Sequence, residues 1–178
     1  MSKSKRSRRK EQEKTCESRK IIKKEIQKNK PITTSKILTI LKDCPNFFGC
    51  LAEDQLEFTT IQSFPAFFIV NIDSSDKEGS HWISLGIYKD SVEIFDTLGF
   101  KIFKWSSIPC TLLKFLHRII GRRSLRISKR IQGPDSILCG FYCIFYVLMR
   151  PYFSWNMIQK QFSSNFEDND RQLIKLLG

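Results

Sequence analysis

The sequence predicts a single α+β domain in which a small mixed sheet is flanked by helices. The chain has 178 residues, of which 41% are apolar and fifteen are Phe, enough for one hydrophobic core. Segments rich in β-branched and aromatic residues lie in the middle of the chain. Segments with helical periodicity precede and follow them, and no internal repeat is present. Together these observations favour a short sheet with helices on both sides.

Charge divides the chain into segments. Residues 1–30 carry 13 Lys or Arg against 4 acidic residues, and we expect them to form a flexible basic arm before a folded domain at residues 31–178. Residues 101–130 carry nine basic residues and no acidic one, whereas the rest of the chain is net acidic. Two separate basic segments favour an anionic partner such as nucleic acid.

The first half of the domain is predicted to hold one helix and three strands. After Pro31, Thr34 or Ser35 can cap a short helix that ends at Asp43. A loop around an aromatic pair is expected at residues 45–54. The predicted strands follow at residues 66–72, 81–88 and 91–96, the last two joined by a tight turn.

The second half is predicted to hold four helices and one strand. Residues 105–120 carry an apolar stripe, with Pro109 in the first turn. Residues 124–132 alternate between apolar and polar side chains, which indicates a strand. The apolar run at 139–149 reads as a buried central helix. The remaining helices are expected at 154–162 and 170–177.

Cys139 is the first candidate for chemistry. It lies between a Gly-Pro turn and the predicted central helix, and the partial positive charge of a helix N-terminus favours the nucleophilic thiolate. Gly140 would let the backbone approach a bound substrate closely. Cys143, one turn later, is expected to be an inert buried residue. Because most buried cysteines are inert, the assignment depends on partners elsewhere in the chain.

Those partners are His81, Asp96 and Gln132. Antiparallel pairing of the two hairpin strands would bring the start of one, at His81, beside the end of the other, at Asp96. This is the geometry of a base and the carboxylate that orients it. Gln132 can donate its side-chain amide to an oxyanion, and Trp82 can form a wall of the site. The combination predicts a cysteine protease.

Three motifs make this prediction more specific. Gly79–Trp82, Ile94–Phe100 and Gln132–Gly140 resemble the corresponding segments of the adenain-like (adenovirus-type) cysteine endoproteases of clan CE, which are encoded by viruses and by Polinton/Maverick transposons. The likeness extends in order over about residues 34 to 162 and includes Phe47-Phe48-Gly49.

The resemblance implies a papain-like site arrangement of the adenain/SUMO-protease type. Cys139 would attack, His81 would act as base, Asp96 would orient it and Gln132 would help to form the oxyanion hole. It further implies cleavage of virion or capsid precursors at small Gly-containing sites, by a monomer in the nucleus of the host cell or in the virion. No cofactor would be required, and DNA would act as partner and activator. The candidate DNA-binding residues are Arg122, Arg123, Arg126, Lys129 and Arg130.

The chain also departs from adenain. Asp96 stands where adenain has Glu. SUMO proteases, like this chain, have Asp at this position. Gly121 aligns near the cysteine that adenain bonds to an activating peptide, and Cys110 is the nearest substitute. Much of adenain's C-terminal extension is missing, while the basic arm is additional.

Three alternatives remain open. One is a protease that removes SUMO-like or ubiquitin-like modifiers, and another is a non-enzymatic nucleic-acid-binding protein. A zinc site is disfavoured because the spacing of its candidate ligands, Cys44, Cys50, Cys139 and Cys143, is poor. The six cysteines do not suggest a disulfide framework, and the longest apolar run is too short to span a membrane.

Overall fold

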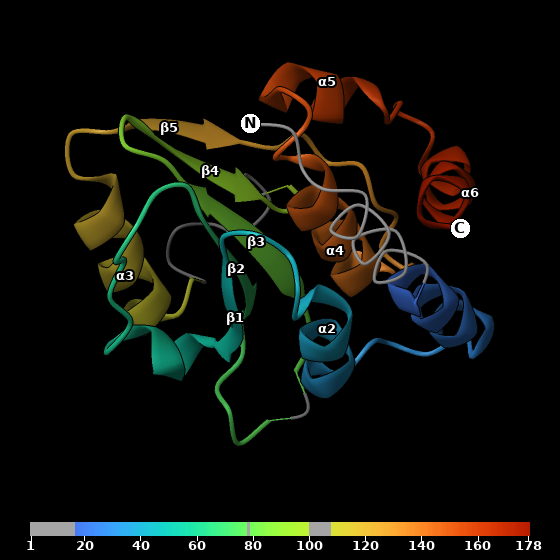
Figure 1. Ribbon diagram of the computed structural model, residues 1–178, viewed down its shortest axis with the longest axis horizontal. Helices are drawn as coiled ribbons and strands as arrows, with labels where there is room; N and C mark the ends of the chain where they lie inside the picture. The colour runs from blue at the N-terminus through green and yellow to red at the C-terminus, as the bar shows by residue number, and fades with distance from the viewer. Residues whose placement is uncertain (1–16, 78, 100–107) are drawn as a thin grey trace, which may run out of the picture.

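A mixed five-stranded sheet forms the centre of the protein (Figure 1). The computed structural model describes residues 17–77, 79–99 and 108–178. The sheet has the order β1-β2-β3-β4-β5, in which β2, β3 and β4 are antiparallel neighbours and the two edge strands run parallel to theirs. The strands are β1 (Phe47–Ala52), β2 (Ala66–Asn71), β3 (Trp82–Ile87), β4 (Ser91–Phe95) and β5 (Ser124–Ile127).

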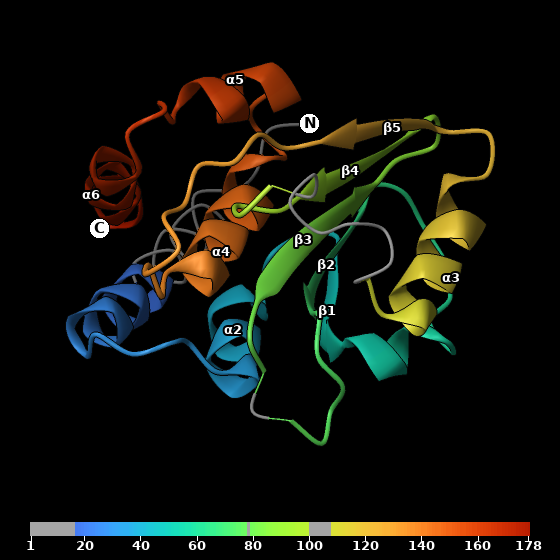
Figure 2. The same cartoon turned by 180° about the vertical axis from the view of Figure 1, so that it is seen from behind.

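Helices cover both faces of this sheet (Figures 1 and 2). One face carries α3 and the short helix η1, and the other carries α4 with α2 beside it. The predicted α+β class, a small mixed sheet flanked by helices, is therefore correct. The helices are α2 (Thr34–Leu41), η1 (Glu53–Leu56), α3 (Cys110–Ile120), α4 (Cys139–Met149), α5 (Trp155–Lys160) and α6 (Phe166–Leu177).

The three central strands are buried on both faces because they separate two hydrophobic clusters. In β2, Phe67 and Ile69 point into the cluster around α4, whereas Phe68 and Val70 point into the cluster around α3. This arrangement explains why these strands read as continuous apolar runs. The helix α4 is itself buried almost all round, as predicted for a central helix.

Several elements differ from their predicted bounds. The predicted loop at residues 45–54 contains β1, which pairs in parallel with β2 through a register irregularity between Phe47 and Gly49. The predicted strand at 124–132 ends at Ile127. It ends there because the hydroxyl of the next residue, Ser128, hydrogen-bonds to the backbone of Asp96, the residue that directly follows β4. Helix α3 begins after Pro109, and residues 105–107 of its prediction lie outside the described residues. The last helix begins four residues early, at Phe166.

Residues 17–27 form a helix inside the segment predicted to be the basic arm. Its Ile22 is buried in the same cluster as α4. The packed domain therefore includes this helix, and residues 1–16 of the predicted arm lie outside the described residues. Within the described ranges, no helix is long and apolar enough to cross a membrane.

A buried ionic network joins α4 to the sheet. Glu93 in β4 is fully buried and accepts hydrogen bonds from Arg150 Nε (2.7 Å) and Nη2 (2.9 Å) and from the Tyr146 hydroxyl (2.8 Å). Gly86 lies directly opposite Glu93 on β3. A Cβ atom at Gly86 would lie 2.1 Å from the Tyr146 hydroxyl oxygen, so only glycine lets the phenol reach the carboxylate.

We expect Glu93→Ala to lower the free energy of unfolding by about 3–5 kcal/mol, because it leaves Arg150 without its buried counter-charge. Urea denaturation measures the change. Arg126→Ala is the matched control: Arg126 also contacts Glu93, at 3.3 Å, but its side chain is half exposed, so a loss below about 1 kcal/mol is expected. Equal losses in the two variants would contradict this account of the network.

Candidate active site

A cleft of about 620 Å³ lies beside the N-terminal end of α4. Its walls come from the start of α2, from η1, from the β2–β3 connection and from the segment that leads into α4. Four of the residues predicted to form a catalytic site or its wall line it together: His81, Trp82, Gln132 and Cys139. The cleft therefore brings residues that lie far apart in the sequence into one site.

The histidine and the carboxylate form a buried pair. His81 directly precedes β3 and Asp96 directly follows β4, and the antiparallel pairing of these strands places the two residues side by side. His81 Nε2 lies 2.7 Å from Asp96 Oδ1, with side chains 5% and 1% exposed. The Leu98 N–H also donates to Asp96 Oδ1, at 2.9 Å. The structure thus brings the pair together as the hairpin predicts.

The surroundings of His81 favour its protonated form. Burial of the imidazole lowers its pKa, but the hydrogen bond to Asp96 and the interaction with Cys139 outweigh burial and raise the pKa to about 9. The interaction with Cys139 also means that the imidazole faces the thiol as well as the carboxylate. The three side chains therefore form one connected group.

The raised pKa of His81 makes stability depend on pH. The native state keeps a proton on His81 that the unfolded chain releases above about pH 6.5. The stabilisation is complete below that pH and is lost as pH rises through about 9. We therefore expect the free energy of unfolding to fall between these values, and this fall to be absent in His81→Gln. The exposed His117, changed to Gln, should keep it, and a flat wild-type profile would contradict the raised pKa.

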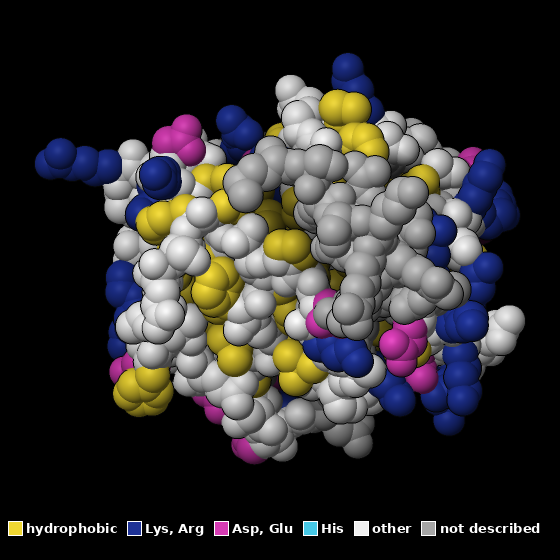
Figure 3. Space-filling model, viewed as in Figure 1, with side chains coloured by type: hydrophobic (Ala, Val, Ile, Leu, Met, Phe, Trp, Pro, Cys, Tyr) yellow, Lys and Arg dark blue, Asp and Glu magenta, His cyan; other side chains and the backbone are white. Residues whose placement is uncertain are grey.

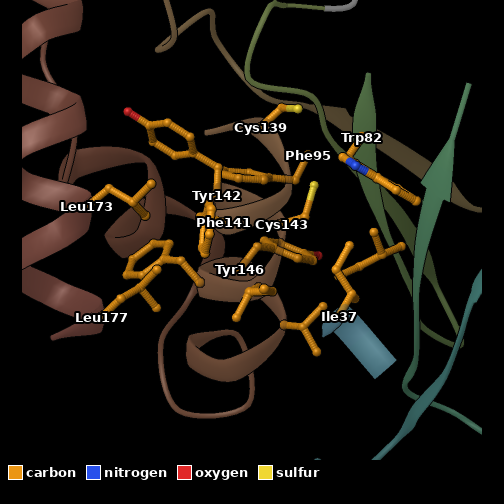
Figure 4. Packing of buried hydrophobic residues seen from close by; sticks show 14 of the residues in the cluster. Ile37, Trp82, Phe95, Cys139, Phe141, Tyr142, Cys143, Tyr146, Leu173 and Leu177 are labelled. Carbon is orange, nitrogen blue, oxygen red and sulfur yellow. The ribbon is translucent and has the colours of Figure 1, made fainter. Parts of the chain in front are cut away.

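Cys139 is the first residue of α4 and lines the cleft. Figure 4 shows Cys139 and Cys143 on α4, with Cys143 deeper among the packed core side chains. Burial raises the pKa of the Cys143 thiol well above its ordinary value, and raises that of Cys50 to about 12. These two thiols are held in the neutral, unreactive form. Among the described cysteines, Cys139 is the one that lines the cleft. The five described cysteines are all free thiols.

Gln132 reaches the cleft with its side-chain amide held at both ends. Its Nε2 donates to the Ser136 carbonyl oxygen at 2.6 Å, and its Oε1 accepts from the Thr97 hydroxyl. A primary amide has two N–H groups, so one is engaged with Ser136 and the second is available. The arrangement can supply a fixed hydrogen-bond donor in the cleft that Cys139 also lines.

Trp82 and Gly140 occupy different positions relative to the cleft. Trp82 lines it, whereas Gly140 is buried and packs against Trp82 and Ile32. A Cβ atom at Gly140 would lie 2.3 Å from Ile32 Cγ2 and 3.1 Å from Trp82 Cδ1. Glycine is thus required here by close packing, and a direct contact of Gly140 with substrate stays a prediction.

The five predicted DNA-binding residues have different surroundings. Arg122 is exposed, and Arg126 is half exposed beside Glu93. Arg123 donates to two backbone carbonyls and lies over the Phe64 ring. Lys129 Nζ donates to the Phe162 carbonyl, and Arg130 donates to the Gln132 carbonyl. In Figure 3, Lys and Arg lie mainly around the periphery of the face shown. Arg122, Arg126 and Lys129 are the exposed members of this set.

Sequence reasoning missed residues that hold the site in place. The Ser128 hydroxyl accepts from the Asp96 N–H at 2.8 Å and donates to the Asp96 carbonyl at 2.6 Å. Gly79 has φ +87° and packs against the side chain of Asn71, which leaves no room for a Cβ atom. The sequence signal at Gly79 was its place in the Gly79–Trp82 motif, whereas Ser128 lies outside the three motifs. Across the described parts of the chain, no group of three His, Cys, Asp or Glu side chains is placed to hold a metal ion.

Comparison with known proteins identifies the fold. No family model and no curated protein matches the chain. Among solved structures, the chain is similar to the ASFV pS273R protease, with a TM-score of 0.54 and 15% sequence identity over 84% of this chain and 67% of that one. At this identity the likeness bears on architecture alone. The mixed sheet and its helices therefore make up a fold like that of the clan CE proteases.

Proposed function

We propose that this protein is a cysteine endopeptidase whose catalytic residues are Cys139, His81, Asp96 and Gln132. The observation that carries the proposal is the buried His81–Asp96 pair, 2.7 Å apart, in contact with a cysteine at a helix N-terminus in a single cleft. The fold shared with a protease supports it. If the His81–Asp96 pair had only a structural role, it would need neither the contact with Cys139 nor the adjacent cleft.

The reaction follows from these positions. The Cys139 thiol and the His81 imidazole share one proton, which lies on His81 as the sulfur attacks the scissile carbonyl carbon. The carbonyl oxygen becomes an oxyanion, which the Gln132 amide stabilises. As the C–N bond breaks, His81 gives the proton to the leaving amine, and a thioester remains. Water then attacks the thioester, its proton passes to His81, and the acid and the thiol are released.

The proposed substrates are precursor proteins of the virion or capsid type, cut at small Gly-containing sites. This finer proposal comes from the resemblance to adenain-like proteases, as does an origin in a virus or a Polinton-type transposon. A peptide library incubated with the wild type and with Cys139→Ala, followed by sequencing of the new N-termini, tests both activity and site preference. Cleavage confined to the Gly-Gly tail of a ubiquitin-like modifier would favour deconjugation instead.

DNA is the proposed partner of the basic segments. If the contacts are mainly to phosphate, log affinity for duplex DNA should fall with log salt at a slope of about −0.9 per contact. Arg122→Ala with Arg126→Ala should flatten the slope by about two contacts, since both side chains are exposed. Salt-independent binding would exclude a phosphate-binding surface, and equal proteolysis with and without DNA at low salt would exclude activation.

A further inference from the structure

Thr97 connects the His81–Asp96 pair to Gln132, the proposed oxyanion donor. It directly follows Asp96, is fully buried, and donates its hydroxyl hydrogen to Gln132 Oε1. Its carbonyl oxygen accepts the N–H groups of both Ile131 (2.9 Å) and Gln132 (3.0 Å). One residue thus holds the backbone and the side chain of Gln132 while its neighbour holds His81.

The hydrogen bonds also fix which way the Gln132 amide faces. The Ser136 carbonyl is an acceptor, so the nitrogen of the amide has to point to it. The amide oxygen then points to Thr97, whose hydroxyl has to act as the donor. Without that hydroxyl, the buried Oε1 would have no donor, and turning of the amide toward the cleft would relieve this loss. The turn would place an oxygen where an N–H is needed.

We propose that Thr97 is the positioning residue for the oxyanion donor of this site. The inference depends on the proposed cysteine-protease function and adds a residue to it. Thr97 acts through Gln132 and touches no reacting atom. Since Thr97 and Asp96 are consecutive, displacement of the end of β4 would disturb the base and the oxyanion hole together.

The test compares Thr97→Val with Thr97→Ser. We expect Val to lower kcat about ten- to hundredfold, less than the 10²–10³-fold known for loss of an oxyanion donor, with KM unchanged. Serine keeps the hydroxyl and should restore kcat to within a few fold. Affinity for a peptide aldehyde, whose thiol adduct occupies the oxyanion hole, should fall in Val by a similar factor. Alkylation of Cys139 by iodoacetamide forms no oxyanion and should keep its rate.

Ser84→Ala is the matched control, because it removes another buried hydroxyl, one that donates to the Cys143 carbonyl at 3.4 Å. Equal loss of kcat in Ser84→Ala and Thr97→Val, or equal slowing of alkylation, would overturn the inference. Should Thr97→Val fail to fold, Thr97→Ala removes the hydroxyl without added bulk. In Gln132→Ala, a further Thr97→Val change should cost nothing. A wild type without cleavage and without aldehyde affinity would instead overturn the proposed function, and Thr97's role with it.

Discussion

Cys139→Ala is expected to abolish proteolysis, with a loss in kcat on the order of 10⁶-fold, the scale known for removal of a protease nucleophile. The reason is that no other described thiol lines the cleft, so no thioester can form. Cleavage of a peptide substrate and labelling with a thiol-reactive probe measure the loss. The variant should fold normally, since Cys139 lies at the edge of the core.

Cys143→Ala provides the matched control. The two cysteines are one helical turn apart on α4, but Cys143 is fully buried and its thiol is held neutral. We expect labelling and cleavage to remain within a few fold of wild type, with some loss of stability from the vacated volume. Full labelling and unchanged proteolysis in Cys139→Ala would assign the nucleophile to another cysteine.

The second large effect is expected at the base. General acid–base catalysis contributes about 10²–10⁴-fold, so His81→Ala should lose at least that factor in kcat. Asp96→Asn should lose less if the carboxylate only fixes the imidazole, which it contacts at 2.7 Å. Steady-state kinetics on the same peptide measure both losses.

His117→Ala is the comparison for His81, because His117 is exposed on α3. It should retain wild-type kcat. A larger loss in Asp96→Asn than in His81→Ala would mean that Asp96 does more than orient its neighbour. A loss below tenfold in His81→Ala would remove His81 from the mechanism.

Sequence reasoning succeeded where the information is local. The hairpin of β3 and β4 has a short turn, so its pairing register follows from the chain itself and places His81 beside Asp96. The apolar run of α4 and the glycine-proline turn before it likewise position Cys139 without reference to distant residues.

Sequence reasoning failed where the structure depends on contacts between residues that are far apart in the chain. The strand β1 contains Gly49 and gains its pairing from β2, which begins fourteen residues after β1 ends. Glu93 is a charged residue within a strand, yet it is buried, because Arg150, 57 residues later, neutralises it. The early end of β5 follows from the bonds of Ser128 to Asp96. None of these pairings has a periodic signal in the sequence.

The glycine beneath Tyr146 bears on how this protein can diverge over time. Gly86 sets how closely α4 approaches the sheet, and α4 carries Cys139 at its N-terminal end. Any side chain at that position would lift the helix and shift the thiol relative to the imidazole. Homologous chains are therefore constrained to exchange Gly86, Glu93, Tyr146 and Arg150 as a set. In an alignment of homologous sequences, covariation of these four positions would be evidence for that constraint, although none of the four residues lines the cleft.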